Sequence, residues 1–371
     1  MTEKDLQNYI CLLSLPGIGN VTAKTLISYC GSVEGVLNAS QKSLLKIPGI
    51  GQTSATAILQ HQQYMPKAEA EVAFIHKNNI EPISYLSPTY PRLLKECSDS
   101  PILLYYKGNT PLDFPKMIAV VGTRNISDYG KERCVDLIEG LKKYDVLVIS
   151  GLAYGVDYFT HMACVQQQVP TIGVLGHGLD RIYPSAHRDL AKRMVQNGGL
   201  LTEFPSGGLP AAENFPRRNR IIAGMTQCTI VVETSAQGGS IITARAAASY
   251  NRDVFAVPGR VGDPVSIGCN WLIKKNTAAM LETVADLVDY YGWESNKGTS
   301  IKRQTQLPLD LSPEESQILT FLREKRTAHI DVICYYTGLA HSSVSPNLLT
   351  LEFRGITQAL PGSMYKLLID Y

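Results

Sequence analysis

Short apolar runs alternate with longer amphipathic stretches in the central part of the chain. The runs are MIAVVG (117–122), VLVISG (146–151), TIGVLG (171–176), LLTEF (200–204), TIVVET (229–234) and VFAVPG (254–259). The intervals between them are long enough for crossover helices, and Val156, Phe159 and Ala163 recur at helical spacing. Continuous apolar strands joined by helices are typical of a parallel sheet covered on both faces. We therefore predict an α/β core over residues 66–291.

An internal repeat opens the sequence and predicts a helical domain over residues 1–65. Leu15-Pro16-Gly17-Ile18-Gly19 and Ile47-Pro48-Gly49-Ile50-Gly51 each precede a segment with small residues at its start. This is a helix-hairpin-helix pattern. The amides of such a turn can contact a DNA phosphate, or the hairpin can serve packing alone. Because neither turn contains Lys or Arg, packing is the favoured interpretation.

The C-terminal part reads as a linker followed by a small separate domain. Residues 292–310 are polar and lack apolar periodicity, which is typical of a linker. Ser312 followed by Pro313 and two acidic residues predicts a helix start. Three short helices fit before Phe353, and two strands around a Pro-Gly turn follow. This order predicts a winged-helix-like domain over residues 311–371.

Composition narrows the class of protein but does not name a partner. The formal charge is +2, with 44% hydrophobic and 18% charged residues, so any nucleic-acid site must be a local basic patch. The eight cysteines include no CxxC pair, which favours reduced thiols in a cytosol. The first ten residues carry charges where a signal peptide needs an apolar run, and no stretch reaches about 18 apolar residues. We expect a soluble, cytoplasmic protein without a membrane partner.

The residues after the first apolar run suit a phosphate better than a dinucleotide. Gly122 and Thr123 are followed by Arg124, which occupies the place of the second glycine of G-x-G-x-x-G. The second run ends at Gly151 without a carboxylate for a ribose hydroxyl, so NAD is not expected. A guanidinium with the hydroxyls of Thr123 and Ser127 at a helix start favours phosphate binding. The alternative is that Arg124 caps a neighbouring helix.

Two further segments could hold a nucleic-acid backbone. Phe215 adjoins the densest basic cluster in the chain, and an aromatic ring can stack on a base. The alternative is a solvated charge run with Phe215 in the core. After the fifth run, Gly239 and Ser240 open a helix as an anion cradle. Three such loops at one sheet edge suit a polyphosphate chain better than a mononucleotide. The cluster after Phe215 consists of Arg217, Arg218, Asn219 and Arg220.

Catalytic groups are harder to find. Asp157 and His161 share a helix face, but no third ligand or nucleophile accompanies them, so a structural role is favoured. Glu203 and Glu233 each follow a strand and could meet in space. We expect no metal site, no cofactor and no enzymatic activity.

Taken together, these motifs closely resemble the DNA-processing protein A family (DprA/Smf) of bacterial transformation and recombination. The resemblance covers most of residues 85–285 in family order. The matching stretches are Tyr90-Pro91-Arg92-Leu93-Leu94, VGTRNISDYG, SGLAYGVDYFTH, GHGLDRIYPSAH, GGLLTEFPSG, FPRRNRIIAGM, VVETSAQGGSIITARAA, VFAVPG and GCNWLIKKNTA.

The resemblance implies a function and a set of DNA-contacting positions. It implies an extended Rossmann-like fold that binds single-stranded DNA, assembles as a homodimer, protects incoming DNA and loads the RecA recombinase in natural transformation. Single-strand-binding protein is a further partner in this picture. The implied contacts are Arg124, Ser127, Gly151, Phe215, Arg218, Asn219 and Arg220.

Three positions depart from the family pattern. Ser185 stands where many relatives carry a basic residue after Tyr-Pro, although Arg188 is close in sequence. The loop before Phe215 has Glu213 as its only charge in the stretch LPAAEN. The expected recognition helix, HSSVSPNLLTLEF, lacks Lys and Arg before Arg354, which favours a protein contact over duplex binding.

The rival interpretation is a nucleotide-processing enzyme. The fold also resembles phosphoribohydrolases of the lysine-decarboxylase-like group, which carry a PGGxGTxxE loop. Aligned on Gly238 and Gly239, the glutamate of that loop falls on Arg245, so the carboxylate that would stabilise an oxocarbenium-like state is missing.

Overall fold

The computed structural model describes residues 1–294 except 209, and residues 311–367 except 361. The chain divides into two compact units, residues 1–297 and 298–371, which are described separately. Of the linker expected at 292–310, residues 295–310 lie outside the described residues.

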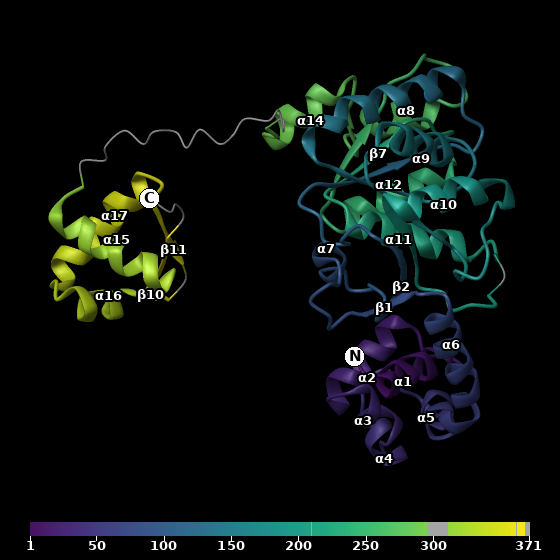
Figure 1. The fold of residues 1–371 in the computed structure, drawn as a ribbon, viewed down its shortest axis with the longest axis horizontal. Coiled ribbons are helices and arrows are strands. Elements are labelled where there is room, and N and C mark those ends of the chain that lie inside the picture. The colour runs from purple at the N-terminus through teal and green to yellow at the C-terminus, as the bar shows by residue number, and fades with distance from the viewer. Residues whose placement is uncertain (209, 295–310, 361, 368–371) are drawn as a thin grey trace. The chain divides into compact units, whose positions relative to one another are not determined.

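The first unit begins with a helical domain that contains both predicted hairpins (Figure 1). Gly17 and Gly49 have φ of 76° and 80°, the left-handed conformation that each turn needs. Gly19 and Gly51 then cap the following helices. The helix-hairpin-helix prediction is confirmed. The helices are α1 (Glu3–Ser14), α2 (Asn20–Cys30), α3 (Val33–Leu37), α4 (Gln41–Leu44), α5 (Gln52–Leu59) and α6 (Met65–Lys77).

Among the described residues, nine strands form one sheet in the order β1-β2-β6-β5-β4-β3-β7-β8-β9. The six apolar runs form β3 to β8 and pair in parallel, as predicted. The strands β1 and β2 precede them in sequence, and β2 joins antiparallel to β6. The bounds are β1 (Glu81–Ser84), β2 (Leu103–Gly108), β3 (Met117–Val121), β4 (Leu147–Ser150), β5 (Thr171–Val174), β6 (Gly198–Thr202), β7 (Cys228–Val231), β8 (Asp253–Ala256) and β9 (Ala279–Met280).

Helices cover both faces of this sheet (Figure 1). Alternate residues of β3 enter different cores: Ala119 packs in the cluster that contains residues of α11 and α12, while Ile118 packs with residues of α8 and α9. The parallel strands are largely apolar because both of their faces are buried. The helices are α7 (Arg92–Lys95), α8 (Asp128–Leu141), α9 (Val156–Gln167), α10 (Arg188–Gln196), α11 (Asn214–Met225), α12 (Gly239–Ser249), α13 (Ile267–Lys274) and α14 (Val284–Tyr291).

The second unit has winged-helix architecture, as predicted. Ser312 caps its first helix and forms a reciprocal capping box with Glu315. The three helices share a small apolar core, and the strands pair antiparallel in the order β10-β12-β11. The elements are α15 (Pro313–Lys325), β10 (Thr327–His329), α16 (Ile330–Thr337), α17 (His341–Phe353), β11 (Thr357–Leu360) and β12 (Met364–Leu367).

Candidate nucleic-acid interface

Two adjoining hollows lie where β3, β4 and β5 end, the edge at which parallel sheets bind ligands. The inner pocket has a volume of about 30 Å³. The outer groove is open and has about 650 Å³. Arg124 and Tyr154 line both hollows and form the border between them. The inner pocket also contains Gly151, Ala153, Leu175, Gly176, His177, Tyr183, Pro184, Phe215 and Arg218. The outer groove also contains Asn125, Ile126, Gly155, Tyr158, Phe159, Ala186 and His187.

Arg218 provides a buried positive charge in the inner pocket. Its exposed fraction is 4%, and its guanidinium donates a hydrogen bond to the carbonyl of Val174. A Cβ atom on Gly151 would collide with this guanidinium, so only glycine leaves room for it. Burial lowers the pKa of Arg218 to about 10 and Asp157 opposes that shift, so the side chain stays charged at neutral pH. Its Nε atom has no hydrogen-bond partner among the described residues.

Arg124 extends from the loop after β3 and lies over the ring of Phe215, at 5.5 Å from the ring centroid. The structure therefore brings together two predicted site residues that are distant in sequence. The backbone of the loop is fixed on both sides: Thr123 N donates to the Glu233 carbonyl at 2.7 Å, and Asn125 N donates to Thr123 Oγ1 at 3.2 Å. Gly122 packs closely on Val156, where a Cβ atom would collide.

The loop from Gly151 to Gly155 packs directly against the Arg124 loop. Gly155 has φ of 76°, and a Cβ atom there would collide with the carbonyl of Thr123. Val156 N donates to that same carbonyl at 3.1 Å. Ala153 N donates to the Asp157 carboxylate at 3.2 Å. The two loops thus form one rigid border around the inner pocket.

Ser127 has a different role from the phosphate contact that was expected. It is the N-cap of α8, where its Oγ accepts from Gly130 N at 3.1 Å. Its hydroxyl also donates to the Glu233 carboxylate, and its amide donates to the same carboxylate at 2.9 Å. Because these partners occupy the hydroxyl and the amide, Ser127 positions the helix that follows the Arg124 loop.

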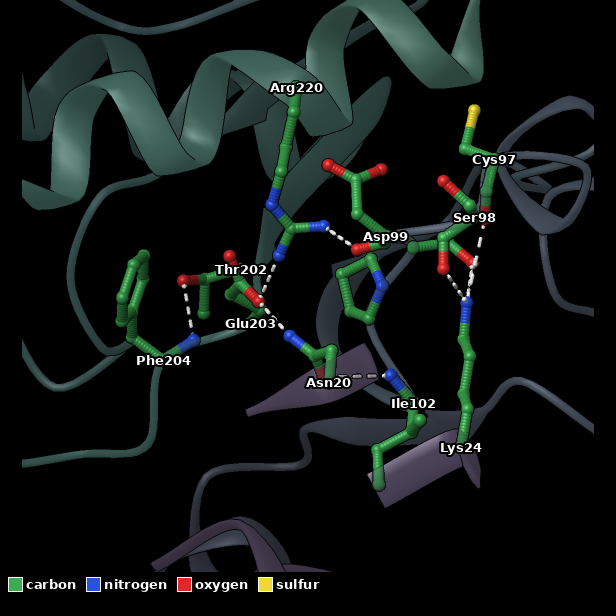
Figure 2. A network of polar contacts seen from close by, with 12 residues as sticks. Asn20, Lys24, Cys97, Ser98, Asp99, Ile102, Thr202, Glu203, Phe204 and Arg220 are labelled. Atoms are coloured by element: carbon green, nitrogen blue, oxygen red, sulfur yellow. Dashed lines mark hydrogen bonds and ion pairs between the residues drawn. The ribbon is translucent and has the colours of Figure 1, made fainter. Parts of the chain in front are cut away.

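Arg220 also departs from expectation, because it belongs to a polar network between the helical domain and the core (Figure 2). Its guanidinium pairs with Glu203 at 2.5 Å and donates to the carbonyl of Asp99. Glu203 also accepts from Asn20 Nδ2 at 2.7 Å, and Lys24 donates to Ser98 O at 3.2 Å. This network attaches the first hairpin to the core, which supports the packing interpretation of that hairpin.

Glu203 and Glu233 do not meet. Their strands, β6 and β7, are four strand spacings apart in the sheet, or about 19 Å at ~4.8 Å per spacing. Asp157 and His161 of α9 both lie near Arg218, and His161 Nδ1 lies 2.7 Å from Thr171 Oγ1. Within the described ranges, no group of three or more His, Cys, Asp or Glu residues could hold a metal ion.

The remaining predicted residues line neither hollow. Gly239 and Ser240 begin α12, and the hydroxyl of Ser240 is buried without a partner in the described part of the chain. Arg217 is exposed and its guanidinium lies 5.3 Å from the Phe204 ring centroid. Asn219 is half-buried on α11. Their contact with nucleic acid stays a prediction.

Sequence reasoning predicted Phe215 but missed other aromatic and imidazole residues of the site. Tyr154 and Tyr183 are each 51% exposed. His177 Nδ1 lies 2.8 Å from the carbonyl of Gly178, and its buried Nε2 has no partner among the described residues. Burial lowers the pKa of His177. For Tyr154 and His177 the available signal was a ring within a few residues of the carboxyl ends of β4 and β5; Tyr183 lies farther along the chain and offers no such signal.

Comparison with known proteins shows that three family models match consecutive parts of this chain. The model of DNA recombination-mediator protein A matches residues 81–292. Models of a SAM-like helix-hairpin-helix tandem and of the DprA winged helix domain match residues 11–61 and 302–363. Protein Smf of Synechocystis is 30% identical over 403 residues, which cover 99% of this chain and 100% of that protein.

Solved structures agree with this assignment. The X-ray structure of DNA processing protein A from Streptococcus pneumoniae is 34% identical and superposes with a TM-score of 0.67, covering 77% of this chain and 98% of that one. DNA processing protein A from Helicobacter pylori, described for its unique single-stranded DNA binding mode, is 27% identical with a TM-score of 0.53, covering 58% and 97%. Since the family model spans more than half of this sequence and a curated relative aligns with nearly all of it, the chain belongs to the DNA recombination-mediator protein A family, also called DprA or Smf.

Proposed function

We propose that the chain binds single-stranded DNA at the inner pocket and the outer groove. The observation that carries the proposal is the buried cation Arg218 beside Arg124, which lies over the ring of Phe215 at the carboxyl edge of the sheet. Fixed guanidinium groups bind phosphate oxygens, and aromatic rings stack on bases without regard to sequence. DNA processing protein A from Helicobacter pylori has been described for its single-stranded DNA binding mode, which supports the same ligand class here.

The sizes of the two hollows suit different parts of a nucleotide. The inner pocket, at about 30 Å³, has room for one or two waters or a comparably small group, so it suits a phosphate oxygen better than a base. The outer groove, at about 650 Å³, is large enough for a nucleoside. A strand would thus place its backbone at Arg124 and Arg218 and its bases toward the groove.

The test compares a fluorescent oligothymidylate with the matching duplex at two salt concentrations. We expect tighter binding of the single strand, with log K falling about 0.7 per neutralised phosphate as log salt rises. Arg124→Ala should weaken binding about ten- to a hundredfold, because a charge-assisted hydrogen bond contributes roughly 1.5–3 kcal/mol. Arg92→Ala, an exposed arginine on α7 outside both hollows, is the matched control. Duplex binding as tight as single-strand binding would contradict the proposal.

The finer role that we propose is protection of incoming DNA and loading of RecA during natural transformation, in the cytoplasm. A protein that binds the phosphate backbone of single-stranded DNA without cutting it can keep that strand accessible to a second protein. The family assignment supports RecA as that second protein, and DNA coated by single-strand-binding protein as the substrate. Strand exchange on coated DNA, with wild type and with Arg124→Ala, tests the role. If the protein protected DNA from nuclease but did not stimulate strand exchange, the RecA-loading role would be rejected. A protein that only covers and protects DNA would remain.

A homodimer is also part of the proposal. Exposed apolar side chains occur on neighbouring elements: Ile242 on α12 is 49% exposed, and Ile267 and Trp271, one turn apart on α13, are 42% and 37% exposed. The guanidinium of Arg245 lies 5.7 Å from the Trp271 ring centroid, which joins the two helices. Exposed apolar patches mark interaction sites, and a second copy presents the same patch in a twofold dimer. Light scattering of the intact chain measures the oligomeric state.

We further propose that the chain is not an enzyme. Arg245 occupies the place of the phosphoribohydrolase glutamate and contacts Trp271, while Glu203 and Glu233 are engaged in separate hydrogen-bond networks. Hydrolysis of DNA or of nucleoside monophosphates by purified protein, abolished by Glu203→Gln or Glu233→Gln, would overturn this.

A further inference from the structure

Tyr154 is an exposed aromatic residue on a backbone that cannot move freely. It belongs to the loop between β4 and α9, and half of its surface is exposed. Its two sides are fixed: the Leu152 carbonyl lies 3.0 Å from His187 Nδ1, and Val156 N donates to Thr123 O at 3.1 Å. The loop therefore presents the ring in one place at the cost of leaving it accessible to water.

No packing role accounts for the exposed part of this ring. One edge of Tyr154 contacts His187, with the ring centroids 5.0 Å apart at 76°. Among the described residues its hydroxyl has no hydrogen-bond partner. The exposed part of the ring therefore contributes no apolar burial to the fold and is accessible to a ligand.

The position of Tyr154 gives the exposed ring a function. Together with Arg124 it forms the border between the inner pocket and the outer groove. A phosphate held by Arg124 and Arg218 would place the attached nucleoside beside this border. Beyond the border, the outer groove contains Tyr158, whose ring lies 4.6 Å from that of His187 and inclines to it by 31°. The groove is thus lined by rings that share His187 as a support.

We propose that Tyr154 is the stacking platform for the base of the nucleotide next to the phosphate that Arg124 binds. The inference rests on the proposed single-strand binding and adds the residue that holds a base. The occupant is an unpaired nucleobase, because a paired base has its faces covered by its neighbours in the duplex. Stacking is indifferent to base identity, so the platform gives affinity without sequence preference.

The experiment measures oligothymidylate binding to the full chain with Tyr154→Ala and Tyr154→Phe. Tyr154→Ala should weaken binding about 5- to 100-fold, the range of one base–aromatic stack. Tyr154→Phe keeps the ring and should bind like wild type. Tyr29→Ala, which removes a 62% exposed tyrosine of the helical domain, is the matched control and should change nothing.

A second readout separates stacking from a general loss of structure. An oligonucleotide with 2-aminopurine loses fluorescence when its base stacks on an aromatic ring, so wild type should quench the probe at one position and Tyr154→Ala should not. An oligonucleotide with abasic sites should bind wild type and Tyr154→Ala equally. Unchanged affinity and quenching in Tyr154→Ala, with wild type binding tightly, would overturn the platform alone. Failure of wild type to bind any single strand would reject the proposed function and the platform with it.

Discussion

Arg218 and Arg220 lie two positions apart on α11, and their side chains contact different parts of the protein. A helix turns about 100° per residue, so side chains at i and i+2 leave nearly opposite sides. Arg218 faces the end of β5 in the inner pocket, whereas Arg220 faces Glu203 and the loop at Asp99. A run that reads as one basic patch in sequence is thus two separate charges in the fold. Of the two, only Arg218 lines the inner pocket where we propose that DNA binds.

We expect Arg220→Ala to act on stability. The substitution would leave Glu203, whose side chain is 4% exposed, without its cation, and breaking such a pair costs about 3–5 kcal/mol. Urea unfolding of the intact chain measures the loss. Arg217→Ala, an exposed neighbour, should change the free energy of unfolding by less than about 0.5 kcal/mol. An Arg220→Ala protein of wild-type stability that had lost DNA affinity as Arg124→Ala does would show that Arg220 leaves this network to bind DNA.

At the scale of elements, the strands and helices follow from local pattern, but several pairings do not. The runs that became β3 to β8 were predictable because burial on both faces requires continuous apolar residues. The antiparallel insertion of β2 beside β6 was not, because no local pattern states which distant strand is the partner. The same holds at the site: Arg124 and Gly151 were predicted from loops after strands, and Phe215 and Arg218 from the basic cluster. The partner of Arg220 was not predictable, because it is a carboxylate on another element.

The packing of α9 on the sheet predicts a pH dependence of stability. Burial, with Arg218 adding to it, lowers the pKa of His161 to about 3 from its ordinary value of 6.5. In the unfolded chain His161 is therefore protonated below pH 6.5, whereas in the folded chain it stays neutral until about pH 3. The contribution of neutral His161 to the free energy of unfolding is therefore complete above pH 6.5. It decreases as the pH falls from 6.5 toward 3, and the loss is about 2 kcal/mol at pH 5.

Urea unfolding at pH 7 and pH 5 measures this loss. His161→Asn retains a group that can donate to Thr171 but does not titrate, so its stability should change less between the two pH values than that of wild type. His76→Asn, at a side chain 64% exposed, should behave as wild type. If the free energy of unfolding changed equally between pH 7 and pH 5 in wild type and His161→Asn, His161 would not be the group responsible.

At the scale of the whole molecule, the second unit carries no basic surface on its expected recognition helix. Within α17, residues 341–353 include neither Lys nor Arg. Large apolar side chains are exposed instead: Phe353, at the end of α17, is 83% exposed, and Tyr335 on α16 is 82% exposed. These features favour contact with a protein over contact with a DNA groove.

Removal of residues 311–371 should therefore leave single-strand affinity within about twofold of the intact chain. The reason is that both hollows and every residue that lines them belong to the first unit. Anisotropy with oligothymidylate measures the effect, and Arg124→Ala in the shortened chain should still lose about ten- to a hundredfold. A large loss of affinity in a shortened chain that unfolds as cooperatively as the intact one would place DNA contacts in the second unit.

The network around Glu203 also sets an order of events during synthesis. Asn20 and Glu203 are bonded across 183 positions of sequence. At about 5–20 residues per second, a ribosome needs roughly 10–40 s to make the second partner after the first. The buried core of the helical domain includes Leu103 and Tyr105 of β2 and can form early, but the other edge of β2 must wait for β6 before it is covered. From the synthesis of β2 until that of β6, the nascent chain exposes one unpaired edge of β2, which is the kind of surface that chaperones hold until translation supplies the partner.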